Sequence, residues 1–216
     1  ARRITSVKAF FRWLQRGGIL IHDPAAKVVQ QSVMSPLPSV LSNEEVEKIV
    51  EVANKLRTAA KPDTRPFVLL TLLLETGIKK GECLSITRNH IDEEAPNGPI
   101  LFVRYASPSS RYKERKIALS TDWVGAYHEY LTQYNPADHI FPWSPRRLEY
   151  LLEDIGEAAG LDKHLSFDML RWTSALDDWK SGMETEKIRQ KLGVSKIQWR
   201  EVSLKLRQLA GEKVEG

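Results

Sequence analysis

Lysine and arginine are concentrated in three clusters of this sequence, where their charges could bind an anionic partner. Residues 1–22 carry five cations and no acid, and the stretch RYKERK at 111–116 packs four cations around Glu114. A third cluster repeats at helical spacing near the C-terminus and consists of Lys196, Arg200, Lys205 and Arg207. Such clusters bind polyanions, most often nucleic acid. The other interpretation is that they are three solvated faces of an ordinary protein.

A further pair of cations, Lys79 and Lys80, lies in the stretch LETGIKKGECLSITRNHID, just past Gly77. Lysines that follow a helix C-terminus usually complement the helix dipole and stay solvated. A buried turn would favour smaller, neutral residues at these positions. By itself the pair therefore does not predict a site.

Composition limits the class of protein. The chain has 216 residues, of which 42% are hydrophobic and 28% charged, with a net charge of +4. These values fit one large folded domain, or a domain with a fragment of another. The single cysteine, Cys83, excludes a disulfide framework, and no group of His, Cys, Asp and Glu has metal-ligand spacing, so we expect no cofactor and no metal. No apolar run is long enough to span a bilayer, and nothing at the start of the sequence has the charged, apolar and small-residue order of a signal peptide, so we expect a cytoplasmic, nucleoid-associated protein.

Periodicity and end signals predict helices in two parts of the chain. ITSVKAFFRWLQRGG, residues 4–18, has apolar residues at helical spacing and a glycine end. Residues 26–39 carry prolines and little periodicity, which is typical of a linker. Ser42 with Glu45 forms a capping-box pattern, so we expect a second domain to begin at about residue 40.

The second domain is expected to hold helices around a small sheet. Pro66 opens an apolar helix that Gly77 ends. GPILFVRYA and ERKIALS predict a β-hairpin with the loop SPSSRYK. Further helices are expected at about 121–134, 144–160, 166–182, 183–193 and 196–210. The expected fold class is mainly α with a small antiparallel β-sheet, that is, α+β.

This order of segments resembles the tyrosine recombinase, or phage integrase, family. The segments that carry the resemblance are ARRITSVKAFFRWLQRGGILIHDPAAKV, LPSVLSNEEVEKIV, LLETGIKKGECLSITRNHID, YKERKIALS and LSFDMLRWTSALDDWKSGMETEKIRQKLGVSKI. In the family, these segments are the last helix of the core-binding domain, the start of the catalytic domain, the first catalytic arginine, the end of the hairpin that bears the catalytic lysine, and the His-x-x-Arg box with Leu-Gly-His.

The resemblance covers nearly the whole chain and implies a domain organisation. Residues 1–25 would be the C-terminal helix of a core-binding domain, 26–39 the linker, 40–211 a catalytic-domain-like fold and 212–216 a tail. Further core-binding helices are expected to precede Ala1 in the native protein.

The family chemistry defines what each catalytic position needs. A tyrosine hydroxyl attacks a DNA phosphodiester, two arginines and a histidine or tryptophan stabilise the phosphoryl oxygens, and a lysine and a histidine transfer protons. The resemblance places Lys79, Ser110, Asp168, Arg171, Val194 and Ser203 at these positions, in chain order. Only Arg171 is of the family type, although Lys113 lies close enough to Ser110 to be the hairpin lysine.

The other positions predict a degenerate site. Lys79 keeps a charge but lacks the planar fork of arginine, and Asp168 would repel phosphate. Val194 can neither donate a proton nor form a hydrogen bond. Tyr150 is the last tyrosine of the chain, so no shift of register places a tyrosine near Ser203.

Several interpretations remain open at this stage. We favour a catalytically degenerate relative that binds duplex DNA and acts in regulation, in DNA organisation or beside a recombinase, with other copies of itself or an active recombinase as further partners. The alternatives are an active recombinase with an unusual residue set or a partner's nucleophile, and a protein-interaction module. Arg171 would contact phosphate or pair with Asp168, and Lys80 would be solvated. The expected DNA contacts are Arg2, Arg3, Lys8, Arg12, Lys79, Arg111, Lys113, Arg115, Arg171, Lys196 and Arg200.

Overall fold

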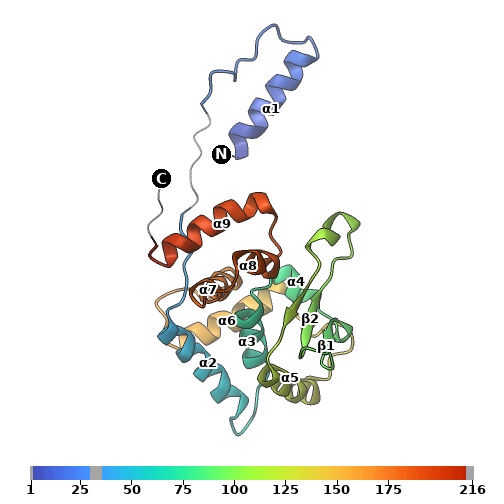
Figure 1. The fold of residues 1–216 in the computed structure, drawn as a ribbon, viewed down its shortest axis with the longest axis vertical. Helices are drawn as coiled ribbons and strands as arrows, with labels where there is room; N and C mark the ends of the chain where they lie inside the picture. The colour runs from blue at the N-terminus through green and yellow to red at the C-terminus, as the bar shows by residue number, and fades with distance from the viewer. Residues whose placement is uncertain (1, 30–35, 213–216) are drawn as a thin grey trace. The chain divides into compact units, whose positions relative to one another are not determined.

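The computed structural model describes residues 2–29 and 36–212 of the chain, which forms two compact units, Ala1–Leu37 and Pro38–Gly216. Residues 30–35 of the expected linker and 213–216 of the expected tail lie outside the described residues. The first unit contains helix α1 (Arg2–Arg16), which ends at Gly17 and Gly18 as predicted (Figure 1). The side chain of Lys8 donates to the carbonyl of Val28 over 2.7 Å and ties α1 to the turn that follows it.

The second unit is mainly helical, which confirms the predicted fold class. Its helices are α2 (Asn43–Arg57), α3 (Arg65–Thr76), α4 (Lys80–Leu84), α5 (Thr121–Tyr134), α6 (Pro145–Ala158), α7 (Phe167–Lys180), α8 (Thr185–Leu192) and α9 (Lys196–Leu209). The capping box of Ser42 and Glu45 is present at the start of α2. The hydroxyls of Ser144, Ser166 and Ser195 cap α6, α7 and α9, each accepting a backbone N–H from three residues further on.

Helix α3 is the centre of the core. Its apolar residues Val68, Leu69, Leu70, Leu72 and Leu73 are at most 1% exposed, and α3 packs against α2, α5 and α7. Full burial of each such side chain stabilises the fold by about 1.5–3 kcal/mol. The helix ends at Gly77 in the left-handed conformation, and the chain continues through the buried Ile78 to Lys79.

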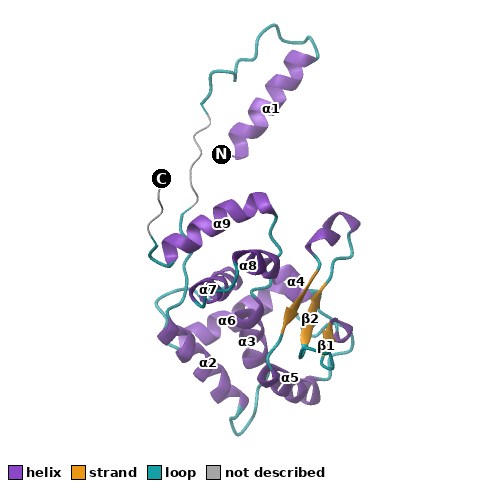
Figure 2. Ribbon diagram, in the orientation of Figure 1, coloured by secondary structure: helices purple, strands orange, loops and turns teal. Residues whose placement is uncertain are grey.

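A three-stranded antiparallel sheet lies beside these helices (Figure 2). Strands β2 (Ile100–Val103) and β3 (Arg115–Ala118) form the predicted hairpin, with buried Leu101 opposite buried Ile117. Strand β1 (Ile91–Asp92) was not predicted and follows the short 3₁₀ helix η1 (Arg88–His90). The hairpin loop contains a second 3₁₀ helix, η2 (Pro108–Lys113).

Helices α7, α8 and α9 share a second apolar cluster. Ala175, Leu176, Ile188, Leu192 and Leu206 are its buried members, and the rings of its partly buried tryptophans, Trp179 and Trp199, lie 6.4 Å apart. α9 therefore rests on α7 and α8, as Figure 1 shows. Among the described residues, no helix combines the length and apolar character needed to cross a membrane.

Candidate functional site

Arg171 is held where two helix ends meet. It lies in the second turn of α7, and its guanidinium donates to the carbonyl of Gly77, at the end of α3, and to that of Leu192, at the end of α8. Burial lowers the pKa of Arg171 to about 10, so the group stays charged at neutral pH. The predicted pairing with Asp168 is not what holds Arg171, because the described hydrogen bonds of Arg171 go to these carbonyls, while Asp168 is exposed.

Lys79 brings a second cation to the same place. It is the N-cap of α4, its side chain is half-buried, and its backbone N–H donates to Glu82 over 2.9 Å. Burial lowers the pKa of the Lys79 ammonium, and the charges of Arg171, Lys113 and Arg115 lower it further, whereas Glu82 opposes them. A bound anion would relieve this repulsion between cations.

Arg115 forms a buried ion pair with Glu82, the residue that accepts the backbone N–H of Lys79. Its Nη2 lies 2.9 Å from Oε2 of Glu82, its Nε donates to the carbonyl of Lys191 over 2.6 Å, and the Arg115 and Glu82 side chains are 7% and 3% exposed. Burial alone would raise the pKa of Glu82, but the bond and charge of Arg115 lower it to about 2. The expectation that Arg115 contacts DNA is therefore corrected, because its guanidinium is buried against protein groups.

Tyr105 joins this pair and is not arranged as a nucleophile. Its hydroxyl donates to Glu82, and burial together with this bond raises the pKa of Tyr105 to about 12. A general base needs a pKa near the working pH, and Glu82 is too weak a base for that role. The ring of Tyr105 also lies 5.9 Å from the ammonium of Lys113.

Two hollows meet at Lys79, Asp168 and Arg171, which line both. The larger, which we call the α6 cleft, has a volume of about 800 Å³ and is lined by Lys79, Lys80, Pro145, Arg146, Glu149, Tyr150, Glu153, His164, Leu165, Ser166, Phe167, Asp168 and Arg171. The smaller, the α9 pocket, has a volume of about 300 Å³ and is lined by Lys79, Asp168, Arg171, Trp172, Ala175, Leu192, Val194, Gln198, Glu201, Val202 and Lys205.

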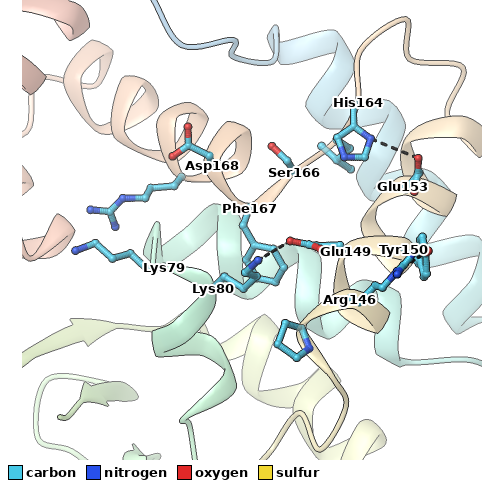
Figure 3. Close-up of a pocket in the computed structure, with 13 residues that line it drawn as sticks. Lys79, Lys80, Arg146, Glu149, Tyr150, Glu153, His164, Ser166, Phe167 and Asp168 are labelled. Carbon is cyan, nitrogen blue, oxygen red and sulfur yellow. Dashed lines mark hydrogen bonds and ion pairs between the residues drawn. The ribbon is translucent and has the colours of Figure 1, made fainter. Parts of the chain in front are cut away.

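The far end of the α6 cleft is less cationic than the end at Lys79. Figure 3 shows Lys79 and Asp168 at one end and Arg146, Tyr150, Glu153 and His164 at the other. Between them, Lys80 pairs with Glu149 at 2.5 Å, so the expectation that Lys80 is merely solvated is corrected. The positive charge that would complement a phosphate therefore lies at the Lys79 end of the cleft.

The structure brings together some of the predicted catalytic positions and not others. Lys79, Asp168, Arg171 and Val194 line the α9 pocket together. Ser203 does not line it, and its hydroxyl donates to the carbonyl of Arg200 over 3.3 Å. The face of α9 turned to the pocket is instead formed by Gln198, Glu201, Val202 and Lys205.

The hairpin position is better matched by Lys113 than by Ser110. Ser110 lines neither the α6 cleft nor the α9 pocket. The charge of Lys113 contributes to lowering the pKa of Lys79, and the ammonium of Lys113 lies 5.9 Å from the ring of Tyr105. The small shift of register that would put Lys113 at the hairpin position stays a prediction.

The remaining predicted DNA contacts are spread over both units. Arg3 and Arg12 are exposed on α1, Arg111 is exposed in the hairpin loop, and Lys196 and Arg200 are exposed at the start of α9. Lys8 is only half-buried but already donates to Val28. The side chain of Arg2 lies outside the part of the chain that the structure describes.

Two residues that matter here were missed from the sequence, Glu82 and Tyr105, and the place of a third, Lys205, in the pocket was not predicted. Glu82 follows Lys79 by three residues, which is the spacing of a capping box, but a lysine at the cap hides that pattern. Tyr105 gives no local signal, since its partner is 23 residues away. Lys205 was assigned only to a basic helix face.

Comparison with known proteins identifies the family of this chain. A model of the phage integrase family matches residues 39–200, and the chain belongs to that family. The second unit thus has the fold of a tyrosine recombinase catalytic domain.

Among its relatives is the tyrosine recombinase XerC of Corynebacterium glutamicum, 26% identical over 202 residues, with 92% of this chain and 64% of that protein covered. XerC of Oceanobacillus iheyensis is 28% identical over 204 residues, which cover 89% of this chain and 65% of that protein. The chain thus spans just under two thirds of the length of these relatives.

Solved structures show the same fold at low identity. The crystal structure of XerA recombinase matches with a TM-score of 0.65 and 22% identity, over 96% of this chain and 73% of that one. The Tn1549 transposon integrase in complex with a circular intermediate DNA matches with a TM-score of 0.72 and 14% identity, over 100% and 74%. A lambda integrase dimer bound to a core site matches with a TM-score of 0.67 and 16% identity, over 99% and 60%.

Proposed function

We propose that this protein binds double-stranded DNA at the Lys79 end of its cleft and does not cut it. The observation that carries the proposal is the arrangement around the α9 pocket. Lys79 and Arg171 converge there as phosphate-binding cations, whereas Val194 and Asp168 supply neither a proton donor of the family type nor a further cation. The site therefore has the charge to hold a phosphodiester and lacks the groups that would break it.

The proposal that the protein binds DNA follows from the positive charges of Arg171 and Lys79. Arg171 uses two of its five N–H donors on the carbonyls of Gly77 and Leu192 and keeps the others for a phosphate. Lys79 contributes a point charge without the fork of an arginine. Contacts between cations and phosphates give affinity with little sequence information, so sequence selectivity would come from other parts of the surface.

The proposal that the protein does not cut DNA follows from the lack of a suitable nucleophile. A serine hydroxyl needs a neighbouring base to attack phosphate, and Ser203 instead donates to a backbone carbonyl of its own helix. Ser203 also lies off the face of α9 that lines the pocket. Tyr105, which lies beside the site, is bound to Glu82 as structural support.

A DNA-binding integrase fold without cleavage suits regulation, DNA organisation or an accessory role in recombination. The partners would be duplex DNA and, in an assembly, other copies of this chain or an active recombinase. Support for such partners comes from the lambda integrase dimer and the Tn1549 integrase, both described in complex with DNA. We infer that the protein acts where DNA is held, at the nucleoid.

One observation favours a second function. Arg171 is retained and the α6 cleft is open, so a partner chain could deliver a nucleophile to a phosphate held there. The protein would then be half of an active recombinase. Covalent capture of DNA distinguishes this alternative from the first proposal.

The first test is DNA binding as a function of salt. Fluorescence anisotropy of a labelled duplex should report affinity that falls steeply with salt, with a log–log slope of about −5 if about six phosphates are neutralised. Lys79→Gln should weaken binding by about 1–3 kcal/mol, because a phosphate contact is lost. A slope near zero, or no binding by a folded chain at low salt, would favour a protein-interaction module.

A further inference from the structure

Lys205 is a buried cation in a place where the family chemistry does not call for one. It lies on α9, two residues after Ser203, and is 8% exposed. Its Nζ is 3.0 Å from Oε1 of Glu201 and 5.8 Å from the ring centroid of Trp172. Because a lysine side chain is rarely buried without a role for its charge, the position of Lys205 needs an explanation.

The lining of the α9 pocket explains the position of Lys205. Lys205 lines it together with Lys79 and Arg171, so three cations from three separate segments face one small hollow. The carboxylates that line the same pocket belong to Asp168 and Glu201. The cationic charge exceeds the anionic charge, and a pocket of about 300 Å³ has room for a phosphate group.

The helix geometry makes this arrangement specific. Residues 198, 201, 202 and 205 follow the spacing of one helix face, and all of them line the pocket. Glu201 and Lys205 are thus neighbours one turn apart on the face of α9 that lines the pocket, with the side chain of Lys205 buried and that of Glu201 64% exposed. The helix that would carry a nucleophile at Ser203 turns a lysine toward the pocket instead.

We propose that Lys205 is a phosphate-binding residue of this site, which exchanges Glu201 for an oxygen of a DNA phosphodiester. The proposal rests on the proposed function, since it names a further contact of the same bound DNA. An ammonium is a compact charge with three donors, so it can turn from a carboxylate to a phosphate while its stem stays packed against Trp172. Glu201 is then the group that competes with DNA.

This assignment predicts opposite effects for the two partners. Lys205→Gln should weaken duplex binding about fivefold or more and flatten the salt slope by about one unit. Glu201→Gln should strengthen binding, because it removes the competitor and one negative charge from the pocket. A purely structural ion pair would lower thermal stability in both variants and leave the salt slope unchanged.

The chain offers a matched control in Glu51 and Lys55. They form the same Glu-x-x-x-Lys pair on α2, with a separation of 2.6 Å, and their side chains are 64% and 71% exposed. Lys55→Gln and Glu51→Gln change the net charge by the same amounts without touching the pocket. Lys205→Arg keeps the charge and should retain most of the affinity.

The test is a salt titration of duplex binding by wild type and these variants, with thermal unfolding of each. If wild type does not bind, the proposed function fails. If wild type binds but Lys205→Gln behaves like Lys55→Gln, the function stands and the assignment of Lys205 is wrong. If Lys205→Gln does not fold, Glu201→Gln decides: a gain over Glu51→Gln supports the assignment, and no gain overturns it.

Discussion

Arg115 on β3 and Glu82 on α4 form a buried ion pair, with two guanidinium–carboxylate bonds of 2.9 and 3.0 Å. The same carboxylate accepts the backbone N–H of Lys79, and Arg115 also holds the carbonyl of Lys191. The pair thus joins the sheet, the segment that carries Lys79 and the end of α8. The ion pair holds these three segments in position around the site, while its own side chains are buried.

Glu82→Gln should destabilise the protein by about 3 kcal/mol at neutral pH, because it leaves the buried charge of Arg115 without a counter-charge. The folded-state pKa of Glu82 is about 2, below its ordinary value of 4.5. Its contribution is therefore fully present above about pH 4.5 and is lost as the pH falls toward 2. Urea unfolding from pH 7 to pH 3 should show the difference between wild type and variant shrinking with acid.

Glu186→Gln is the control for this prediction. Hydrogen bonds from Arg189 and Gln190 also lower the pKa of Glu186, but its side chain is 46% exposed, so solvent screens the pair. Its effect on unfolding should be small. An equally large loss in both variants, or a loss in Glu82→Gln that does not depend on pH, would contradict the structural role of Glu82.

Gly193→Ala should disturb the turn after α8. Gly193 has a φ of +60°, and an added Cβ would lie 2.6 Å from Nη1 of Arg115. Gly182→Ala provides the comparison, because Gly182 has a φ of +80° but open space around it. Backbone strain should destabilise both variants by about 1–3 kcal/mol. Gly193→Ala should show the larger drop in melting temperature, because its Cβ also meets Arg115. Equal drops in melting temperature would mean that the side chain of Arg115 moves aside with no loss of stability.

Charge reversal should separate cations that contact DNA from cations that do not. Arg12→Glu and Lys113→Glu should each weaken duplex binding by about 1–3 kcal/mol, whereas Lys55→Glu should do little. Anisotropy titrations at one salt concentration compare the three. If Lys55 matters as much as the others, the binding surface lies elsewhere on the protein.

Much of the fold could be predicted from local signals. Ser42, Ser144 and Ser166 mark helix starts because their hydroxyls cap the N–H groups three residues on, and that pattern depends only on neighbours. Gly77 and Gly193 mark helix ends because the left-handed conformation favours glycine. The two-residue strand β1 was missed because only its pairing with β2 defines it.

The site was predictable only in part. The resemblance placed Lys79 and Arg171 at family positions, and they do share a pocket. It could not show that Arg115 is buried against Glu82, 33 residues earlier in the chain, so a cation in a basic cluster was taken for a DNA contact. It also could not show which face of α9 meets the pocket, so Lys205 was predicted only as part of a basic helix face and Ser203 as the residue at the nucleophile position.

Covalent capture of DNA distinguishes a protein that only binds DNA from one that cuts it. The protein is incubated with a nicked suicide duplex that carries a family-type site and is then analysed by denaturing electrophoresis. We predict binding without any denaturant-stable band, for wild type and for Ser203→Tyr alike, because position 203 does not line the pocket and Val194, at the family's histidine position, cannot transfer a proton. A denaturant-stable protein–DNA band that disappears on Ser203→Ala or Tyr105→Phe would contradict it.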